Sequence, residues 1–278
     1  MKFSVLVIAL IFGHGVFGQT EKKLLPVTIP NSQVHELRSE VVGLSYKLYV
    51  KLPVNFDAGK SYDFIFMLDP EYSFALAANI TDHLVQRNDL PEVVIVGIGY
   101  VVDDYRVNRT RDYTPTHSLA GGYNAETQKH SGGGENFLRF IATELFPYLE
   151  GVFGKPKTRT LCGHSYGGLF ATWILFTKPG IFDRFVIVSP SLWFDNSKLM
   201  KSIEANPALI AQIKSRAYFT VGGSEGGMID DVNHLKSVVT KVKSPGFRYK
   251  FETAENENHN TVFPRAFSNG LRFTFGVR

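Results

Sequence analysis

The sequence predicts an α/β fold, with a single domain built on a mostly parallel, doubly wound sheet. Strand-like segments alternate with helical segments along the chain, as in folds where crossover helices join parallel strands. Several strand segments are continuous apolar runs, which indicates that helices cover them on both faces. With 278 residues, 44% of them hydrophobic and 20% charged, the chain is long enough for one large core.

The first predicted strand, residues 44–52, alternates in a strand period and ends at Pro53. Continuous apolar runs predict strands at residues 64–68 and 93–99, and the series is completed by residues 158–162, 184–188, 217–221 and 249–253. Between them, helical patterns predict helices at residues 73–86, 134–150, 167–177, 195–204, 230–242 and 262–276. Nothing in this order has the composition of a domain linker, so we expect one domain over residues 19–278.

Residues 101–133 differ from the rest of the chain. They are rich in Tyr, Thr, Asn, Arg and Gly and contain no clear periodic element. A loop of this length in a compact domain is usually functional or disordered. We expect it to lie over the carboxyl ends of the strands, where open α/β sheets bind ligands.

Residues 1–18 have the pattern of a secretory signal peptide. Lys2 precedes an apolar run at residues 3–12, and cleavage after Gly18 would leave Gln19 as the first residue of the mature chain. The alternative is a retained membrane anchor, which the short run disfavours because a span needs about 20 apolar residues. We therefore expect a secreted or periplasmic protein without stable membrane insertion after cleavage.

Composition narrows the possible functions. A net charge of +4 without a long basic run gives no support for nucleic-acid binding. The single cysteine, Cys162, excludes an intramolecular disulfide and is expected to be a small packing residue. An exported chain without disulfides suits a bacterial periplasm or secretion route. We expect neither a cofactor nor a metal.

The segment Gly163-His164-Ser165-Tyr166-Gly167 follows a short apolar run and precedes a helical pattern. A G-x-S-x-G sequence in this context predicts a strained strand-to-helix turn that projects a nucleophilic serine above the sheet. The glycines leave room for the turn, and the N-terminus of the following helix directs N–H groups toward the site. Ser165 is the predicted nucleophile. His164 beside it is expected to pack or to bind substrate.

A serine hydroxyl needs a base to take its proton, and His259 is the candidate. It follows the last predicted strand in a polar loop just before the last helix. The third member of a triad is an acid after the strand at 217–221. Glu225 lies in that loop, and Asp230 and Asp231 are its rivals, although they are expected to begin the next helix.

An oxyanion hole needs two N–H donors. The backbone of Tyr166, directly after the nucleophile, predicts one. The other is expected in the turn Asp69-Pro70-Glu71, and since Pro70 has no N–H, Asp69 is preferred over Glu71.

These motifs together resemble the esterase D-like branch of α/β-hydrolases, particularly the group of ferric-enterobactin and related siderophore esterases. The resemblance runs from about residue 45 to 275 and is carried by the segments 66–69, 109–115, 132–140, 163–168, 182–184 and 189–193, together with Glu225 and His259. It implies an α/β-hydrolase fold with Ser165, Glu225 and His259 as the triad. Pro70 departs from the family, which more often has Gly there, and removes one backbone N–H from the turn that would supply the second oxyanion donor.

The same branch resembles feruloyl and acetyl-xylan esterases, so the substrate does not follow from the family. Arg109 and Arg111 would suit an anionic ligand, and Trp193 could stack a planar acyl group. We expect a small-molecule ester substrate, a siderophore ester first and a carbohydrate-linked acyl ester as the alternative. A catalytically silent binding protein is the alternative from another class.

Overall fold

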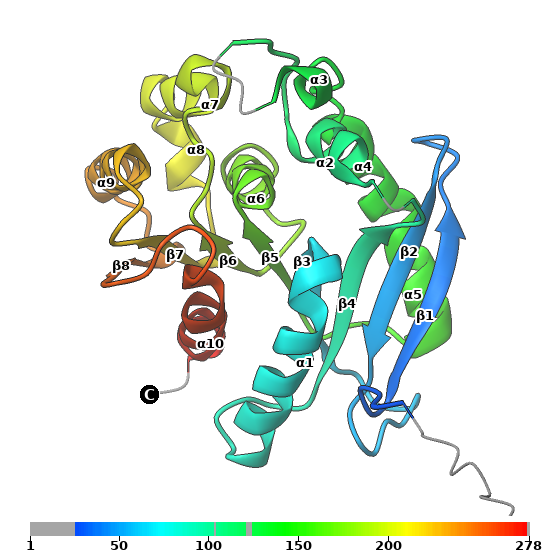
Figure 1. The fold of residues 1–278 in the computed structure, drawn as a ribbon. Coiled ribbons are helices and arrows are strands. Elements are labelled where there is room, and N and C mark those ends of the chain that lie inside the picture. The colour runs from blue at the N-terminus through cyan, green and yellow to red at the C-terminus, as the bar shows by residue number, and fades with distance from the viewer. Residues whose placement is uncertain (1–25, 103, 121–123, 277–278) are drawn as a thin grey trace, which may run out of the picture.

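The structure, a computed structural model, describes residues 26–102, 104–120 and 124–276. Its centre is an eight-stranded sheet in the order β1-β2-β4-β3-β5-β6-β7-β8 (Figure 1). The strands are β1 (Ser32–Arg38), β2 (Ser45–Lys51), β3 (Asp63–Leu68), β4 (Val93–Tyr100), β5 (Arg159–His164), β6 (Arg184–Val188), β7 (Arg216–Gly222) and β8 (Arg248–Ala254). β2 is antiparallel to both of its neighbours, and every other pairing is parallel. The mostly parallel sheet is therefore confirmed, as are all seven predicted strands.

Every connection from β3 onward contains at least one helix. The helices are α1 (Pro70–Gln86), α2 (Arg106–Tyr113), α3 (Ala125–Gln128), α4 (Gly134–Phe140), the π-helical turn η1 (Ile141–Leu145), α5 (Phe146–Phe153), α6 (Tyr166–Thr177), α7 (Phe194–Ala205), α8 (Ala208–Ala211), α9 (Gly227–Thr240) and α10 (Val262–Phe275). The six predicted helices are present, with the one expected at 134–150 running through α4, η1 and α5. No helix in the described part of the chain is long and apolar enough to cross a membrane. The predicted signal peptide, residues 1–18, lies outside the described residues.

Four short elements, β1, α2, α3 and α8, were not predicted. β1 is an edge strand that pairs only with β2, and most of its side chains are exposed, so it carries no apolar run. The segment 101–133, expected to lack regular structure, contains α2 and α3. The buried side chains of α2 are Thr110, Asp112 and Tyr113, two of them polar, so an apolar period could not reveal this helix.

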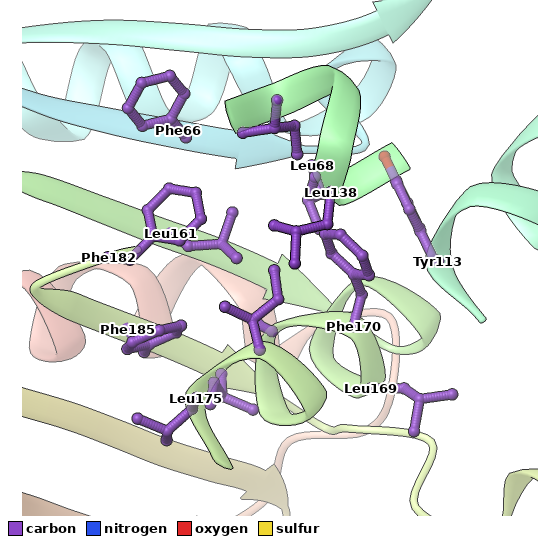
Figure 2. Packing of buried hydrophobic residues seen from close by; sticks show 14 of the residues in the cluster. Phe66, Leu68, Tyr113, Leu138, Leu161, Leu169, Phe170, Leu175, Phe182 and Phe185 are labelled. Carbon is purple, nitrogen blue, oxygen red and sulfur yellow. The ribbon is translucent and has the colours of Figure 1, made fainter. Parts of the chain in front are cut away.

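The sheet separates two apolar layers. On one face α1 and α10 pack against the strands, and on the other lie α6, α9 and the α4–α5 region (Figure 1). Neighbouring residues of β5 show the division, because Leu161 packs into one layer and Cys162 into the other. Figure 2 shows part of the first layer, in which Leu161 and Phe185 from the strands and Phe170 from α6 belong to one cluster. Burial on both faces accounts for the continuous apolar runs.

α10 lies close against the sheet because Gly270 faces β6. A Cβ added at this position would lie 2.6 Å from Val186 Cγ1. The approach is possible only for glycine, and it fixes the helix that follows the loop carrying His259. The loops after β5, β7 and β8 leave the same edge of the sheet, since these strands are parallel.

Candidate active site

Ser165 occupies the turn between β5 and α6, with φ 60° and ψ −119°. A positive φ is strained for a residue with a side chain and is typical of functional sites. The turn is held by the Ser165 N–H, which donates to the Val188 carbonyl at 3.0 Å. A Cβ added at Gly163 would collide with the Gly167 carbonyl oxygen, so the turn needs glycine there. The structure thus has the geometry expected of a nucleophile elbow.

Glu225 and His259 form a hydrogen-bonded pair. His259 Nδ1 lies 2.6 Å from Glu225 Oε2, and the side chain of Glu225 is only 2% exposed. Ser189 Oγ and the Gly222 N–H donate to the other carboxylate oxygen at 2.5 and 2.6 Å. Burial opposes ionisation, but the hydrogen bonds from His259, Ser189 and Gly222 outweigh it and lower the pKa of Glu225. The charged carboxylate is therefore ready to orient the imidazole and to stabilise its cation.

The rival acids lie elsewhere. Asp230 and Asp231 belong to the first part of α9, as the sequence indicated. Asp230 is exposed and Asp231 half-buried, and burial together with the charge of Asp230 raises the pKa of Asp231. Of the three candidates, Glu225 is the one that the structure pairs with the histidine.

Ser165 Oγ has Ser191 Oγ as its hydrogen-bonding neighbour, at 3.4 Å. Among the described residues, no hydrogen bond joins Ser165 Oγ to His259. Nucleophile–base contacts are often long without substrate and tighten only in the reacting complex. Both side chains line the same cavity.

The two predicted oxyanion donors differ in their surroundings. The Tyr166 N–H is at the first position of α6, where a helix offers no internal acceptor, and its role as an oxyanion donor stays a prediction. The structure does not support Asp69 as the second donor. Its N–H donates to the Tyr113 Oη at 3.1 Å, a buried hydrogen bond that occupies this group. The sequence could not reveal this, because Tyr113 is 44 residues away on the unpredicted helix α2.

Arg109 connects the turn after β3, which contains Asp69, to the nucleophile elbow. Its guanidinium donates to both carboxylate oxygens of the fully buried Asp69, at 2.5 and 2.8 Å, and to the His164 carbonyl at 3.3 Å. It lies over the rings of Tyr113 and Tyr166, with 5.4 and 5.6 Å to their centroids. Burial opposes its charge, but Asp69 outweighs this and raises the pKa of Arg109. A permanent cation therefore stands at the wall of the cavity.

Arg111, predicted to bind substrate together with Arg109, is turned away. Its Nε donates to Asp112 at 2.7 Å, and Nη1 donates to Asn108. Asp112 is buried and also accepts from Tyr46 and Tyr100, so Arg111 belongs to a structural network and does not line the cavity. Residues two apart on a helix lie on nearly opposite faces, so Arg109 faces the cavity and Arg111 faces away from it.

The cavity above Ser165 has a volume of about 540 Å³. Aromatic side chains form much of its wall, and Trp193 is among them as predicted. The aromatic and cationic lining residues are Tyr72, Tyr105, Tyr166, Trp193, Phe263, Arg106 and Arg109. Sequence reasoning gave no role at the site to Ser191, Met228, Asn260 and Phe263. Met228, Asn260 and Phe263 belong to no motif and reach the cavity only through the fold. The described residues contain no group of three His, Cys, Asp or Glu side chains suited to a metal ion.

Residues 39–272 match the family model described as a putative esterase. The chain belongs to this esterase family. The esterase is 28% identical over 260 residues to the ferri-bacillibactin esterase BesA of Bacillus subtilis, covering 88% of this chain and 90% of BesA. It is also 28% identical over 271 residues to the siderophore enterobactin esterase of Emericella nidulans, covering 82% of this chain and 88% of the relative.

Among solved structures, the esterase is similar to the BES protein of Bacillus cereus, with a TM-score of 0.80 and 29% identity. That match covers 91% of this chain and 98% of the other. The α/β-hydrolase fold and the resemblance to siderophore esterases are thereby confirmed. The chain is a serine esterase of this fold, and the catalytically silent alternative has no support.

Proposed function

We propose that this esterase hydrolyses the ester bonds of a siderophore. The observation that carries the proposal is the cavity in which Ser165 and His259 meet a wall of aromatic rings and two arginines. Aromatic faces suit planar acyl groups such as catecholates, and arginine suits their anionic oxygens or a negatively charged iron complex. The names of the two similar esterases support the same class of substrate.

In the proposed reaction, Ser165 Oγ attacks the ester carbonyl carbon while His259 Nε2 takes the hydroxyl proton. Glu225 holds Nδ1 and stabilises the imidazolium that forms. The Tyr166 N–H donates to the developing oxyanion. His259 then protonates the leaving alcohol, which departs and leaves an acyl-enzyme. A water molecule, deprotonated by His259, releases the acid and restores Ser165.

The arginines have different parts in substrate binding. Arg109 is fixed by Asp69, so it presents its charge at one place beside the elbow. Arg106 is mostly exposed and pairs with Asp104 at 2.9 Å, so it lies at the rim and can follow ligands of different shape. A rigid cation near the ester and an adaptable one farther out suit a large anionic ester.

The deciding experiment compares kcat/KM for enterobactin-type trilactones, with and without iron, against feruloyl and acetyl xylo-oligosaccharides. The Ser165→Ala variant is the blank for each substrate. We expect the trilactones to be preferred by at least about 100-fold, since specificity for a polar substrate reaches this range readily. A preference for the sugar esters would replace this proposal with a carbohydrate acyl esterase.

We further propose that the protein acts outside the cytoplasm, in the periplasm or the medium. The support is the charged and apolar pattern of residues 1–18. Cell fractionation and N-terminal sequencing test it. A mature chain beginning near Gln19 in the exported fraction is expected, and an intact N-terminus in the cytoplasm would contradict it.

A further inference from the structure

His164 is a second histidine at the active site, and the reaction described above does not use it. It ends β5, directly before the nucleophile, and is 9% exposed. Its ring centroid lies 4.4 Å from that of His259, with 37° between the ring planes. Its Nδ1 is hydrogen-bonded to Tyr72 Oη at 3.0 Å. Four side chains therefore lie in sequence: Tyr72, His164, His259 and Glu225.

His164 stays uncharged in this place. Burial lowers the pKa of His164 to about 3, with further contributions from the charges of His259 and Arg109. The Nε2 atom of His164 is buried and makes no hydrogen bond of normal geometry. The backbone of His259 raises the pKa of His164, but less than burial lowers it. A histidine with so low a pKa is a poor acceptor for a proton at neutral pH, so it does not serve as a second base. Its contribution to His259 is the position and the face of its ring.

His259 needs such a contact. It lies in the loop after β8, most of whose residues are exposed or half-buried, and its own side chain is 37% exposed. The hydrogen bond to Glu225 fixes Nδ1 but leaves the ring free to rotate about that bond. Nε2 reaches Ser165 only in a narrow range of ring orientations, and a misplacement of about 1 Å can cost on the order of 100-fold in rate.

We propose that His164 is a positioning residue whose ring face, packed on the ring of His259, fixes the plane of this catalytic histidine. His164 is suited to this because it extends from the end of a central strand, not from a loop. Tyr72 belongs to α1 and is itself packed edge-on against Phe263 of α10, with 6.2 Å between the centroids. The neutral ring also accepts the imidazolium formed during the reaction without repulsion, and its face attracts a cation.

Two substitutions separate the ring contact from the hydrogen bond. His164→Phe keeps an aromatic face and loses the bond to Tyr72, whereas His164→Gln keeps a polar partner for Tyr72 and loses the face. With p-nitrophenyl butyrate, we expect His164→Gln and His164→Ala to lower kcat about 10- to 100-fold with KM nearly unchanged. His164→Phe should restore kcat to within about 5-fold of the wild type, and Tyr72→Phe should have a similarly small effect.

Phe267→Leu is the matched control for stability. Phe267 is fully buried in the same apolar layer and stacks on Phe263, but it is not part of the cavity wall. We expect both Phe267→Leu and His164→Ala to lower Tm, but only His164→Ala to lower kcat. Full activity of His164→Gln, or loss in His164→Phe equal to that in His164→Ala, would overturn the proposal. The inference rests on the ester chemistry of Ser165 and not on the siderophore substrate, and an inactive wild type would contradict that chemistry instead.

Discussion

Glu225 Oε2 accepts a hydrogen bond from His259 Nδ1 at 2.6 Å, while Oε1 of the same carboxylate accepts from Ser189 and from the Gly222 backbone. All these donors lie at the carboxyl ends of neighbouring strands or in the loops after them. Because both oxygens are occupied, the carboxylate cannot rotate. It therefore holds the His259 tautomer that carries its proton on Nδ1.

Replacing Glu225 with Gln should lower kcat by about 100- to 10,000-fold, because the amide no longer stabilises the imidazolium or holds the reactive tautomer. KM should change little. Steady-state kinetics with p-nitrophenyl butyrate measure both values. Asp230→Asn and Asp231→Asn are the controls and should retain full activity. A large loss of activity in either variant would identify that aspartate, and not Glu225, as the acid of the triad.

The same carboxylate links stability to pH. The pKa of Glu225 is lower in the folded protein than in the unfolded chain, so its ionised form stabilises the fold. This contribution is complete above the ordinary glutamate pKa of about 4.3 and is lost as the pH falls through the lower folded value. Urea unfolding of wild type and Glu225→Gln between pH 7 and 3 should show a stability difference that narrows toward acid. A difference that widens would contradict the lowered pKa.

Arg109→Met should destabilise the protein by about 3–5 kcal/mol, because it leaves the buried Asp69 carboxylate without its partner. Adding Asp69→Asn should recover part of that loss. Arg106→Ala, at the exposed rim, should change the free energy of unfolding by less than about 0.5 kcal/mol and raise KM for an anionic ester. Chemical denaturation and kinetics on charged and neutral esters distinguish the two arginines, and a stable Arg109→Met variant would show that the ion pair is dispensable.

Gly163→Ala should unfold or inactivate the enzyme, since its Cβ would collide with the Gly167 carbonyl and force the nucleophile turn to move. We expect a loss of at least about 2 kcal/mol in the free energy of unfolding. Gly227→Ala, with no atom within 4 Å of the added Cβ, is the control and should be neutral or slightly stabilising. Thermal unfolding and fluorophosphonate labelling of Ser165 report stability and turn geometry separately.

The sequence contained enough information for the central strands and for the pairing of Glu225 with His259, because both depend on local patterns. Apolar runs follow from burial on two faces, and chain order places the acid and the base after the last strands. β1 and α2 escaped prediction because an exposed edge strand and a helix with polar buried side chains have no apolar period. The contact from Tyr113 to Asp69 and the turning away of Arg111 depend on how α2 packs, which no local pattern contains.

The placement of Arg109 has a consequence for how such enzymes can diversify. The predicted catalytic side chains come from segments after β5, β7 and β8, whereas Tyr105, Arg106 and Arg109 come from the segment between β4 and α4. Replacing that segment would change the residues that line the substrate cavity and would leave Ser165, Glu225 and His259 in place. Arg109 and Tyr113 are two of the residues that join this segment to the reaction centre, through Asp69 and the His164 carbonyl. An exchange of this segment that keeps both residues preserves their hydrogen bonds to Asp69. An exchange that loses them leaves Asp69 without these partners.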